Sequence, residues 1–234
     1  MPTPPTGSPP AASPPAVAFF DVDETLISVN SMSRFLHHHF RALGRPRSAF
    51  DDAVRGLRDL TERGASRATV ARAYYRHYAG SGDRELAAQG RAWFADELTA
   101  GGLFLRDSVM ALREHRRKGE TVVLVSGSFA PCLNPIAERL GVDTVLCARP
   151  ETVGGVHTGR LDTAMIGEEK AVAVRSLLQE RGITGDRCHA YGDHASDLPM
   201  LLAVGHPVVV GTDPVLVRRA RESGWRRLPR GVPH

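Results

Sequence analysis

Short apolar segments alternate with amphipathic ones from Val17 onward, and this alternation is the feature that most restricts the possible fold. Strand-length apolar runs separated by helical patterns are typical of parallel βαβ units. The strand candidates are Val17–Val22, Thr121–Val125, Thr144–Cys147, Arg187–Tyr191, Pro207–Val210 and Trp225–Leu228. We therefore expect an α/β protein built on a parallel sheet.

A long interval separates the first two strand candidates. Residues 30–105 place apolar side chains at helical spacing, with glycines and a proline between the periodic stretches. A structureless loop of this length is implausible inside a compact domain. The pattern predicts an all-helical insertion, 30–105, in a core formed by 16–29 and 106–234. A small β-hairpin is predicted at Val153–Gly159, with Gly154 and Gly155 as its turn.

The remaining composition restricts the class of protein. Residues 1–15 are rich in proline and small residues, which predicts a disordered tail. The chain has a net charge of +4, but its arginines are scattered and form no basic block interleaved with aromatic residues. Nucleic acid is therefore not the expected partner.

Three cysteines without a CxxC spacing suggest neither a disulfide framework nor a zinc site. No apolar run is long enough to span a membrane, and we expect a cytoplasmic protein; the oligomeric state is not indicated.

Two carboxylates follow the first apolar run. Asp21 and Asp23 lie in the segment DVDET, and side chains two positions apart on a strand share one face. The carboxyl ends of strands in an open α/β sheet are where ligands bind. Two like charges held together need a cation or a shared proton. The pair therefore suggests a metal-assisted site in which one Asp attacks and the other transfers protons. The alternative is a polar strand end exposed to solvent.

Two further segments suggest a phosphate site. Ser126 and Gly127 follow the second strand candidate and precede a helical pattern. A hydroxyl donor, approachable backbone N–H groups and a helix N-terminus would cradle a phosphate, although a serine there can equally be an N-cap. Lys170 lies early in a helical segment, where its charge opposes the helix dipole. Neutralising a phosphoryl group would explain its position; a solvated surface lysine is the alternative.

A second carboxylate pair follows the strand candidate Arg187–Tyr191. Asp193 and Asp197 are spaced so that both can point into the same cleft as Asp21 and Asp23. Hard oxygen ligands suit Mg²⁺, and no Cys/His set favours a softer metal. These four aspartates are therefore the candidate Mg²⁺ ligands.

The four motifs, in this order, resemble those of the haloacid dehalogenase-like hydrolase superfamily, and specifically its phosphoserine-phosphatase-like branch. The match covers Val17 to Leu228. The resemblance implies a Rossmann-like, doubly wound parallel sheet, with the helical insertion as a mobile cap domain. It implies a Mg²⁺-dependent phosphatase that hydrolyses a small phosphorylated metabolite through an aspartyl-phosphate.

The resemblance also implies a role for each motif residue. Asp21 would be the nucleophile and Asp23 the general acid and base. Ser126, the N–H of Gly127 and Lys170 would bind the phosphoryl oxygens. The Asp21 carboxylate, the Asp23 carbonyl and Asp193 would hold Mg²⁺, with Asp197 positioning a metal-bound water or Lys170.

One departure from the pattern concerns the substrate. Phosphoserine phosphatases carry a glutamate nine positions after the nucleophile, where this chain has Asn30. An amide cannot neutralise the substrate ammonium as a carboxylate does, so phosphoserine itself is not the expected substrate. Two alternative functions stay open: phosphoryl transfer to another acceptor, as in a mutase, and noncatalytic phosphate binding.

Overall fold

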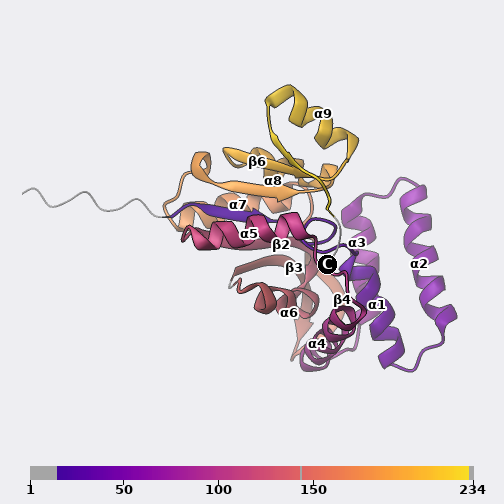
Figure 1. The fold of residues 1–234 in the computed structure, drawn as a ribbon. Helices are drawn as coiled ribbons and strands as arrows, with labels where there is room; N and C mark the ends of the chain where they lie inside the picture. The colour runs from indigo at the N-terminus through magenta and orange to yellow at the C-terminus, as the bar shows by residue number, and fades with distance from the viewer. Residues whose placement is uncertain (1–14, 143, 232–234) are drawn as a thin grey trace, which may run out of the picture.

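The computed structural model describes residues 15–142 and 144–231 (Figure 1). The predicted tail at 1–15 lies outside these residues except for Pro15. Seven strands are present in the described part of the chain: β1 Val17–Phe20, β2 Thr121–Phe129, β3 Thr144–Val153, β4 Val156–Thr163, β5 His189–Gly192, β6 His206–Val210 and β7 Arg226–Leu228. Each strand candidate therefore corresponds to an observed strand, although the ends differ.

All strands form one sheet in the order β4-β3-β2-β1-β5-β6-β7. The pairs from β3 to β7 are parallel, as expected for a doubly wound, Rossmann-like sheet. The edge strand β4 is antiparallel to β3. The two strands form the predicted hairpin, and Gly154 and Gly155 make its turn with positive φ angles. The hairpin is much longer than 153–159 because β3 continues from the sheet core into it.

Helices cover both faces of the sheet. Because successive strand residues point to opposite faces, Phe20 joins the core under α5 and α6, whereas Phe19 joins the core under α7, α8 and α9. The bounds are α5 Arg106–Arg117, α6 Ala130–Leu140, α7 Glu168–Glu180, α8 Leu198–Leu202 and α9 Pro214–Ser223, with 3₁₀ turns η2 Gly185–Arg187 and η3 Ala195–Asp197. The two-sided burial explains why the inner strands are continuous apolar runs.

The segment between β1 and β2 is helical, as its periodicity predicts. It contains α1 Ser31–Ala42, α2 Arg47–Glu62, α3 Arg67–Tyr75, the 3₁₀ turn η1 Arg76–Tyr78 and α4 Asp83–Ala100. In Figure 1 these indigo to magenta helices lie beyond the carboxyl end of β1. That the segment behaves as a separate cap domain stays a prediction.

The helical segment is attached to the core through α4, which packs against α6. The approach is close at Gly90, where an added Cβ would lie 1.9 Å from the carbonyl oxygen of Pro131. Buried Leu86, Trp93 and Phe94 extend the same face of α4. In contrast, α2 has no buried residue. The segment is therefore held firmly at α4 and loosely at α2.

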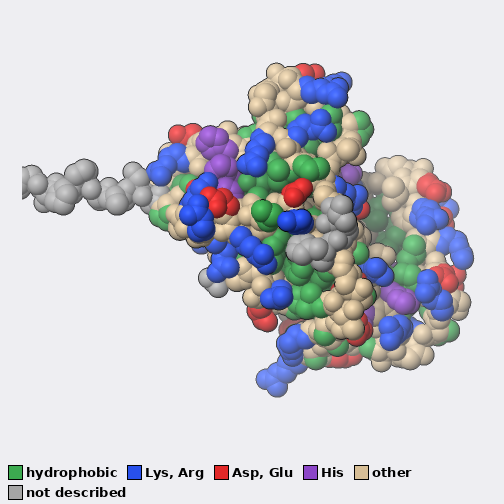
Figure 2. Space-filling view, in the orientation of Figure 1, with side chains coloured by type: hydrophobic (Ala, Val, Ile, Leu, Met, Phe, Trp, Pro, Cys, Tyr) green, Lys and Arg blue, Asp and Glu red, His purple; other side chains and the backbone are tan. Residues whose placement is uncertain are grey.

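The surface is polar and mixed in charge. Figure 2 shows lysine and arginine side chains spread over the visible face, without a single dense patch. Among the described residues, no helix is both long enough and apolar enough to cross a membrane.

Candidate functional site

The first carboxylates lie in the turn that follows β1. The amide of Asp21 donates to the carbonyl of Tyr191 in β5 (2.9 Å), which continues the parallel pairing one residue past the strand. The chain then turns, and the amide of Leu26 donates to the carbonyl of Val22 (2.8 Å). The Asp21 side chain is buried, with 6% of the residue exposed. The turn therefore holds Asp21 at the carboxyl end of the central strand, as predicted.

Lys170 points from the first turn of α7 into the same site. Its Nζ donates to Oδ1 of Asp21 (2.5 Å) and to Oδ1 of Asp197 (2.6 Å), and the side chain is buried. Burial lowers the pKa of Lys170, but the carboxylates of Asp197 and Asp21 raise it by more, so the ammonium stays charged. The lysine is therefore an internal cation and not a solvated surface group.

A third carboxylate completes a cluster of oxygen ligands. One carboxylate oxygen from each of Asp21, Asp193 and Asp197 lies within 4.8 Å of the others. Thr25 donates to Oδ1 of Asp193 (3.0 Å) and so orients it. Burial and the neighbouring Asp197 raise the pKa of Asp193 to about 6. Burial also raises the pKa of Asp21 to about 7, against the opposing effect of Lys170.

The charge balance of this cluster fits a divalent cation. Three carboxylates facing one ammonium leave two negative charges uncompensated when all are ionised. Carboxylate oxygens are the donors that Mg²⁺ prefers. The donor set present is therefore suited to Mg²⁺ both in chemistry and in charge.

Asp23 lies beside the cluster in a different environment. Its Oδ1 is buried and has no hydrogen-bond partner among the described residues. Burial raises the pKa of Asp23 to about 7, although hydrogen bonding from Ser31 opposes the shift. Since a buried polar atom without a partner is costly, this oxygen is available to a group that enters the site.

The predicted phosphate-binding residues Ser126 and Gly127 lie within the last part of β2, whereas the sequence pattern placed them after the strand. Ser126 and Gly127 are the sixth and seventh residues of the strand, whose register shifts between Ser126 and Phe129. The Oγ of Ser126 accepts from the amide of Ser128 (3.1 Å), and Ser31 donates to the Ser128 hydroxyl (2.9 Å). A Cβ at Gly127 would lie 3.2 Å from Ile166. Ser126, Gly127 and Ser128 line the cavity that also contains Asp21.

These residues line one cavity of about 240 Å³. The structure thus brings together every candidate residue from the sequence: Asp21, Asp23, Ser126, Gly127, Lys170, Asp193 and Asp197. Their individual roles stay predictions. Asp197 contacts Lys170 directly, which favours the second of the two roles expected for it.

Several residues at the site were not predicted. Arg67, at the start of α3, lines the cavity and contacts His194 through its Nη1 (3.0 Å to Nε2). The hydroxyl of Tyr75 donates to the carbonyl of Gly127 (3.0 Å). Periodicity could identify Tyr75 only as a core residue, because helical spacing does not reveal what its hydroxyl contacts. No sequence signal selects Arg67 among the arginines of the helical segment.

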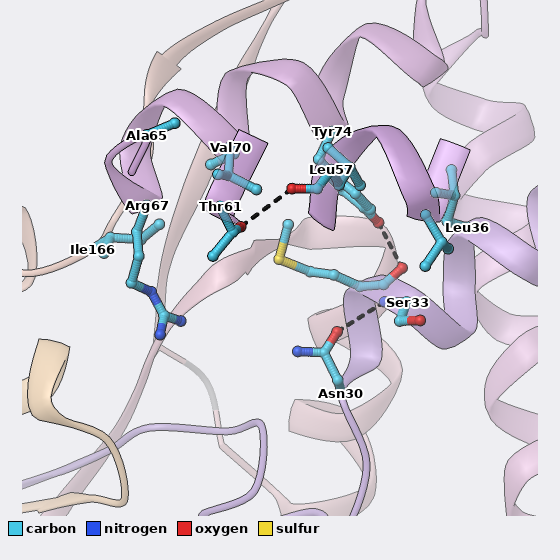
Figure 3. Close-up of a pocket in the computed structure, with 13 residues that line it drawn as sticks. Asn30, Ser33, Leu36, Leu57, Thr61, Ala65, Arg67, Val70, Tyr74 and Ile166 are labelled. Atoms are coloured by element: carbon cyan, nitrogen blue, oxygen red, sulfur yellow. Dashed lines mark hydrogen bonds between the residues drawn. The ribbon is translucent and has the colours of Figure 1, made fainter. Parts of the chain in front are cut away.

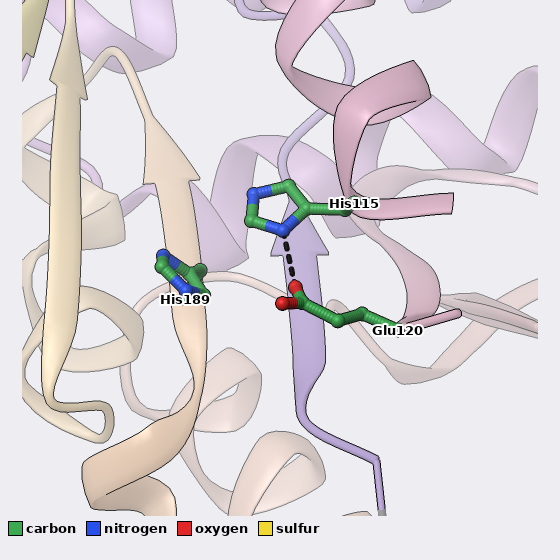
Figure 4. Close-up of side chains that lie close together, drawn as sticks. All are labelled: His115, Glu120 and His189. Atoms are coloured by element: carbon green, nitrogen blue, oxygen red, sulfur yellow. Dashed lines mark hydrogen bonds and ion pairs between the residues drawn. The ribbon is translucent and has the colours of Figure 1, made fainter. Parts of the chain in front are cut away.

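A second group of possible metal ligands lies at the opposite end of the strands. His115, Glu120 and His189 offer ligand atoms within 4.8 Å of one another (Figure 4). His115 pairs with Glu120 through Nδ1, and its Nε2 is 2.8 Å from the hydroxyl of Tyr191. Burial and the neighbouring His115 lower the pKa of His189 to about 4. These contacts give the cluster a structural role at this end of the sheet.

Comparison with known proteins gives consistent results. A model of the haloacid dehalogenase-like hydrolase family matches residues 18–202. The chain is 33% identical over 231 residues to the inhibition of morphological differentiation protein of Streptomyces azureus, covering 89% of this chain and 76% of that protein. It is 34% identical over 220 residues to the phosphoserine phosphatase SerB1 of Mycobacterium tuberculosis, covering 90% of this chain and 69% of that protein.

One solved structure is similar to this chain over most of its length. It is that of a protein of unknown function from Bordetella pertussis, with a TM-score of 0.83 and 26% sequence identity. The match covers 92% of this chain and 99% of that one. The helical segment and the sheet therefore recur together in a second protein.

Proposed function

We propose that this chain, which belongs to the haloacid dehalogenase-like hydrolase family and to its phosphoserine-phosphatase-like branch, is a Mg²⁺-dependent phosphatase. Its proposed substrate is a small phosphorylated metabolite. One observation carries the proposal: Lys170 bridges Asp21 and Asp197 at the strand ends, in a cavity that Ser126 and Gly127 also line. A buried cation between carboxylates, beside approachable backbone N–H groups, is an arrangement suited to a phosphoryl group.

Asp21 is the proposed nucleophile. One of its carboxylate oxygens forms a bond to phosphorus, the bond from phosphorus to the ester oxygen breaks, and an aspartyl-phosphate results. The contact with Lys170 supports this role because it holds the Asp21 carboxylate in one orientation. Lys170 also supplies positive charge where negative charge accumulates on the phosphoryl oxygens.

Asp23 is the proposed proton donor and acceptor. It gives a proton to the departing alcohol, and it then takes a proton from the water that attacks phosphorus and releases phosphate. Two observations support this role: Asp23 lines the cavity, and its buried Oδ1 has no hydrogen-bond partner among the described residues.

Ser126 and Gly127 are proposed to hold the phosphoryl group together with Lys170. The hydroxyl of Ser126 and the amide of Gly127 are the donors, and both residues line the cavity. Tyr75 and Ser31 support the segment from the helical side. Positioning of this kind is the main protein contribution to phosphoryl transfer.

Asp21, the carbonyl of Asp23 and Asp193 would hold Mg²⁺, with Asp197 positioning Lys170. The ion would neutralise charge on the phosphoryl oxygens when bound. We also propose that 30–105 acts as a cap domain over this site, and that the protein acts in the cytoplasm without nucleic acid as a partner.

The test is release of inorganic phosphate from a panel of phosphate monoesters with and without Mg²⁺. We expect hydrolysis only with the metal, and a fall of at least about 10³-fold for Asp21→Asn, since the nucleophile is lost. Full turnover by Asp21→Asn would overturn the proposal. Phosphate recovered on an added alcohol and not in water would identify a phosphotransferase. Binding of phosphate without turnover of any ester would identify a noncatalytic protein.

A further inference from the structure

A second cavity adjoins the proposed active site. It has a volume of about 350 Å³, within the range of small-molecule sites. It lies between α1, α2 and α3 (Figure 3). Four residues line both this cavity and the one around Asp21: Asn30, Met32, Arg67 and Ile166. The two cavities therefore adjoin at these residues.

The walls of the second cavity are apolar. Met32 and Leu36 come from α1, Val54 and Leu57 from α2, and Val70 from α3. Figure 2 shows hydrophobic side chains between the core and α2. A surface of this kind favours an apolar ligand because burial removes nonpolar area from water.

Three polar side chains in these walls, those of Asn30, Thr61 and Tyr74, are already bonded to the backbone. Oδ1 of Asn30 accepts from the amide of Ser33 (2.9 Å), which caps α1. Thr61 donates to the carbonyl of Leu57 (3.1 Å), and Tyr74 donates to the carbonyl of Met32 (2.8 Å). Figure 3 marks these three bonds with dashed lines. They therefore add little polarity to the cavity.

The charges of the cavity lining disfavour a cationic ligand. None of its described lining residues is Asp or Glu, and Arg67 is the one lining residue with a formal charge. Arg67 lines both cavities, and its guanidinium extends away from the helices in Figure 3. A substrate ammonium would meet no carboxylate here. In contrast, an anionic phosphoryl group at one end and an uncharged hydrocarbon at the other match the two cavities.

We propose that the second cavity binds the alcohol portion of the substrate, and that the substrate is a phosphate monoester of an alcohol with an uncharged, apolar hydrocarbon group. This inference rests on the proposed phosphatase function and specifies its substrate class. Asn30 then caps a helix at the junction of the two cavities and does not recognise an amino acid.

The test is a series of unbranched alkyl phosphates from methyl to hexyl, assayed with Mg²⁺ beside glycerol phosphate, phosphoethanolamine and phosphoserine. We expect kcat/KM to rise by about fourfold per methylene once the chain reaches the cavity. We also expect phosphoserine to be a worse substrate than butyl phosphate. Hydrolysis that is independent of chain length, or best with phosphoserine, would overturn the inference but leave the phosphatase proposal intact. If no ester at all is hydrolysed, the phosphatase proposal itself fails.

Two substitutions locate the selectivity. Leu57→Asn and Val54→Asn each place a polar group in the α2 wall, and both should flatten the dependence on chain length by lowering kcat/KM for hexyl phosphate about tenfold. Leu60→Asn is the matched control, because Leu60 is a half-buried leucine of α2 outside the cavity lining. Thermal unfolding of each variant checks the fold. If kcat/KM still rises with alkyl chain length in both wall variants, the hydrocarbon group of the substrate binds elsewhere and the inference is overturned.

Discussion

The hydroxyl of Tyr75 in α3 donates to the carbonyl of Gly127 at the end of β2, over 3.0 Å. This bond joins the helical segment to the proposed phosphate-binding residues. It orients the peptide at Gly127, and the amide of the same residue faces the site in our proposal. Through this bond the helical segment contributes to the geometry of the proposed phosphate site.

Tyr75→Phe should reduce activity more than it reduces stability. The loss of one partly buried hydrogen bond should lower the free energy of unfolding by about 1 kcal/mol. The freed Gly127 peptide should lower kcat/KM roughly threefold to tenfold. Phosphate release and urea unfolding measure the two effects. Tyr191→Phe is the control, because it loses a hydroxyl contact to His115 at the opposite end of the strands. Equal loss of activity in both variants would contradict the role of the Tyr75 bond.

Mg²⁺ should stabilise the protein through the carboxylate cluster. The three carboxylates exceed the charge of Lys170 by two when ionised, so a bound cation relieves their repulsion. At about 100 times the dissociation constant, the gain should be about 2.7 kcal/mol of unfolding free energy. Differential scanning fluorimetry with and without Mg²⁺ measures it. Asp193→Asn should lose most of the shift, whereas Asp186→Asn, on the exposed surface, should keep it. An unchanged shift in Asp193→Asn would remove that residue from the metal site.

Stability should fall in acid because of His189. Its folded-state pKa of about 4 lies below the ordinary value of 6.5, so the unfolded chain binds more protons between these values. The stabilisation is complete above about pH 6.5 and is lost as the pH falls toward 4. Because His189 is partly exposed to solvent, its contribution to the free energy of unfolding is reduced to the order of 1 kcal/mol. Urea unfolding at pH 7.5 and pH 5 measures it. The loss between these two pH values should be smaller in His189→Asn. An identical loss would show that other groups control the acid sensitivity.

Gly90→Ala should destabilise the attachment of α4 to α6. The added Cβ would collide with the backbone of Pro131, which cannot move as a flexible side chain would. We expect a loss of about 2–3 kcal/mol in the free energy of unfolding. Gly56→Ala is the matched control, since Gly56 lies in α2 with no atom within 4 Å of its added Cβ. That variant should gain about 1 kcal/mol from helix propensity. Similar effects of the two substitutions would contradict the close packing at Gly90.

Local patterns predicted the sheet and the motif residues well. The apolar run before Asp21 and the helical spacing around Lys170 each depend on near neighbours in the sequence. The carboxyl-end rule for parallel strands then brings their side chains together. For this reason the cavity contains each predicted residue.

The contacts between the helical segment and the core could not be predicted in the same way. Tyr75 and Leu57 show the same apolar periodicity, but one donates to the phosphate segment and the other lines a cavity. Arg67 reaches the site only because α3 begins beside it. The length of the β3–β4 hairpin also escaped prediction, since the turn at Gly154 marks its tip but not where its strands begin. Each of these depends on how distant segments pack.

The unequal attachment of the helical segment has a consequence for its motions. Four buried residues fix α4, whereas α2 buries none and supplies Val54 and Leu57 to the second cavity. Local opening should therefore begin at α2, so its amides should exchange with deuterium sooner than those of α4. An alcohol product could then leave by a small outward displacement of one helix. In the proposed function, the phosphate site would stay assembled between turnovers, ready for the next ester.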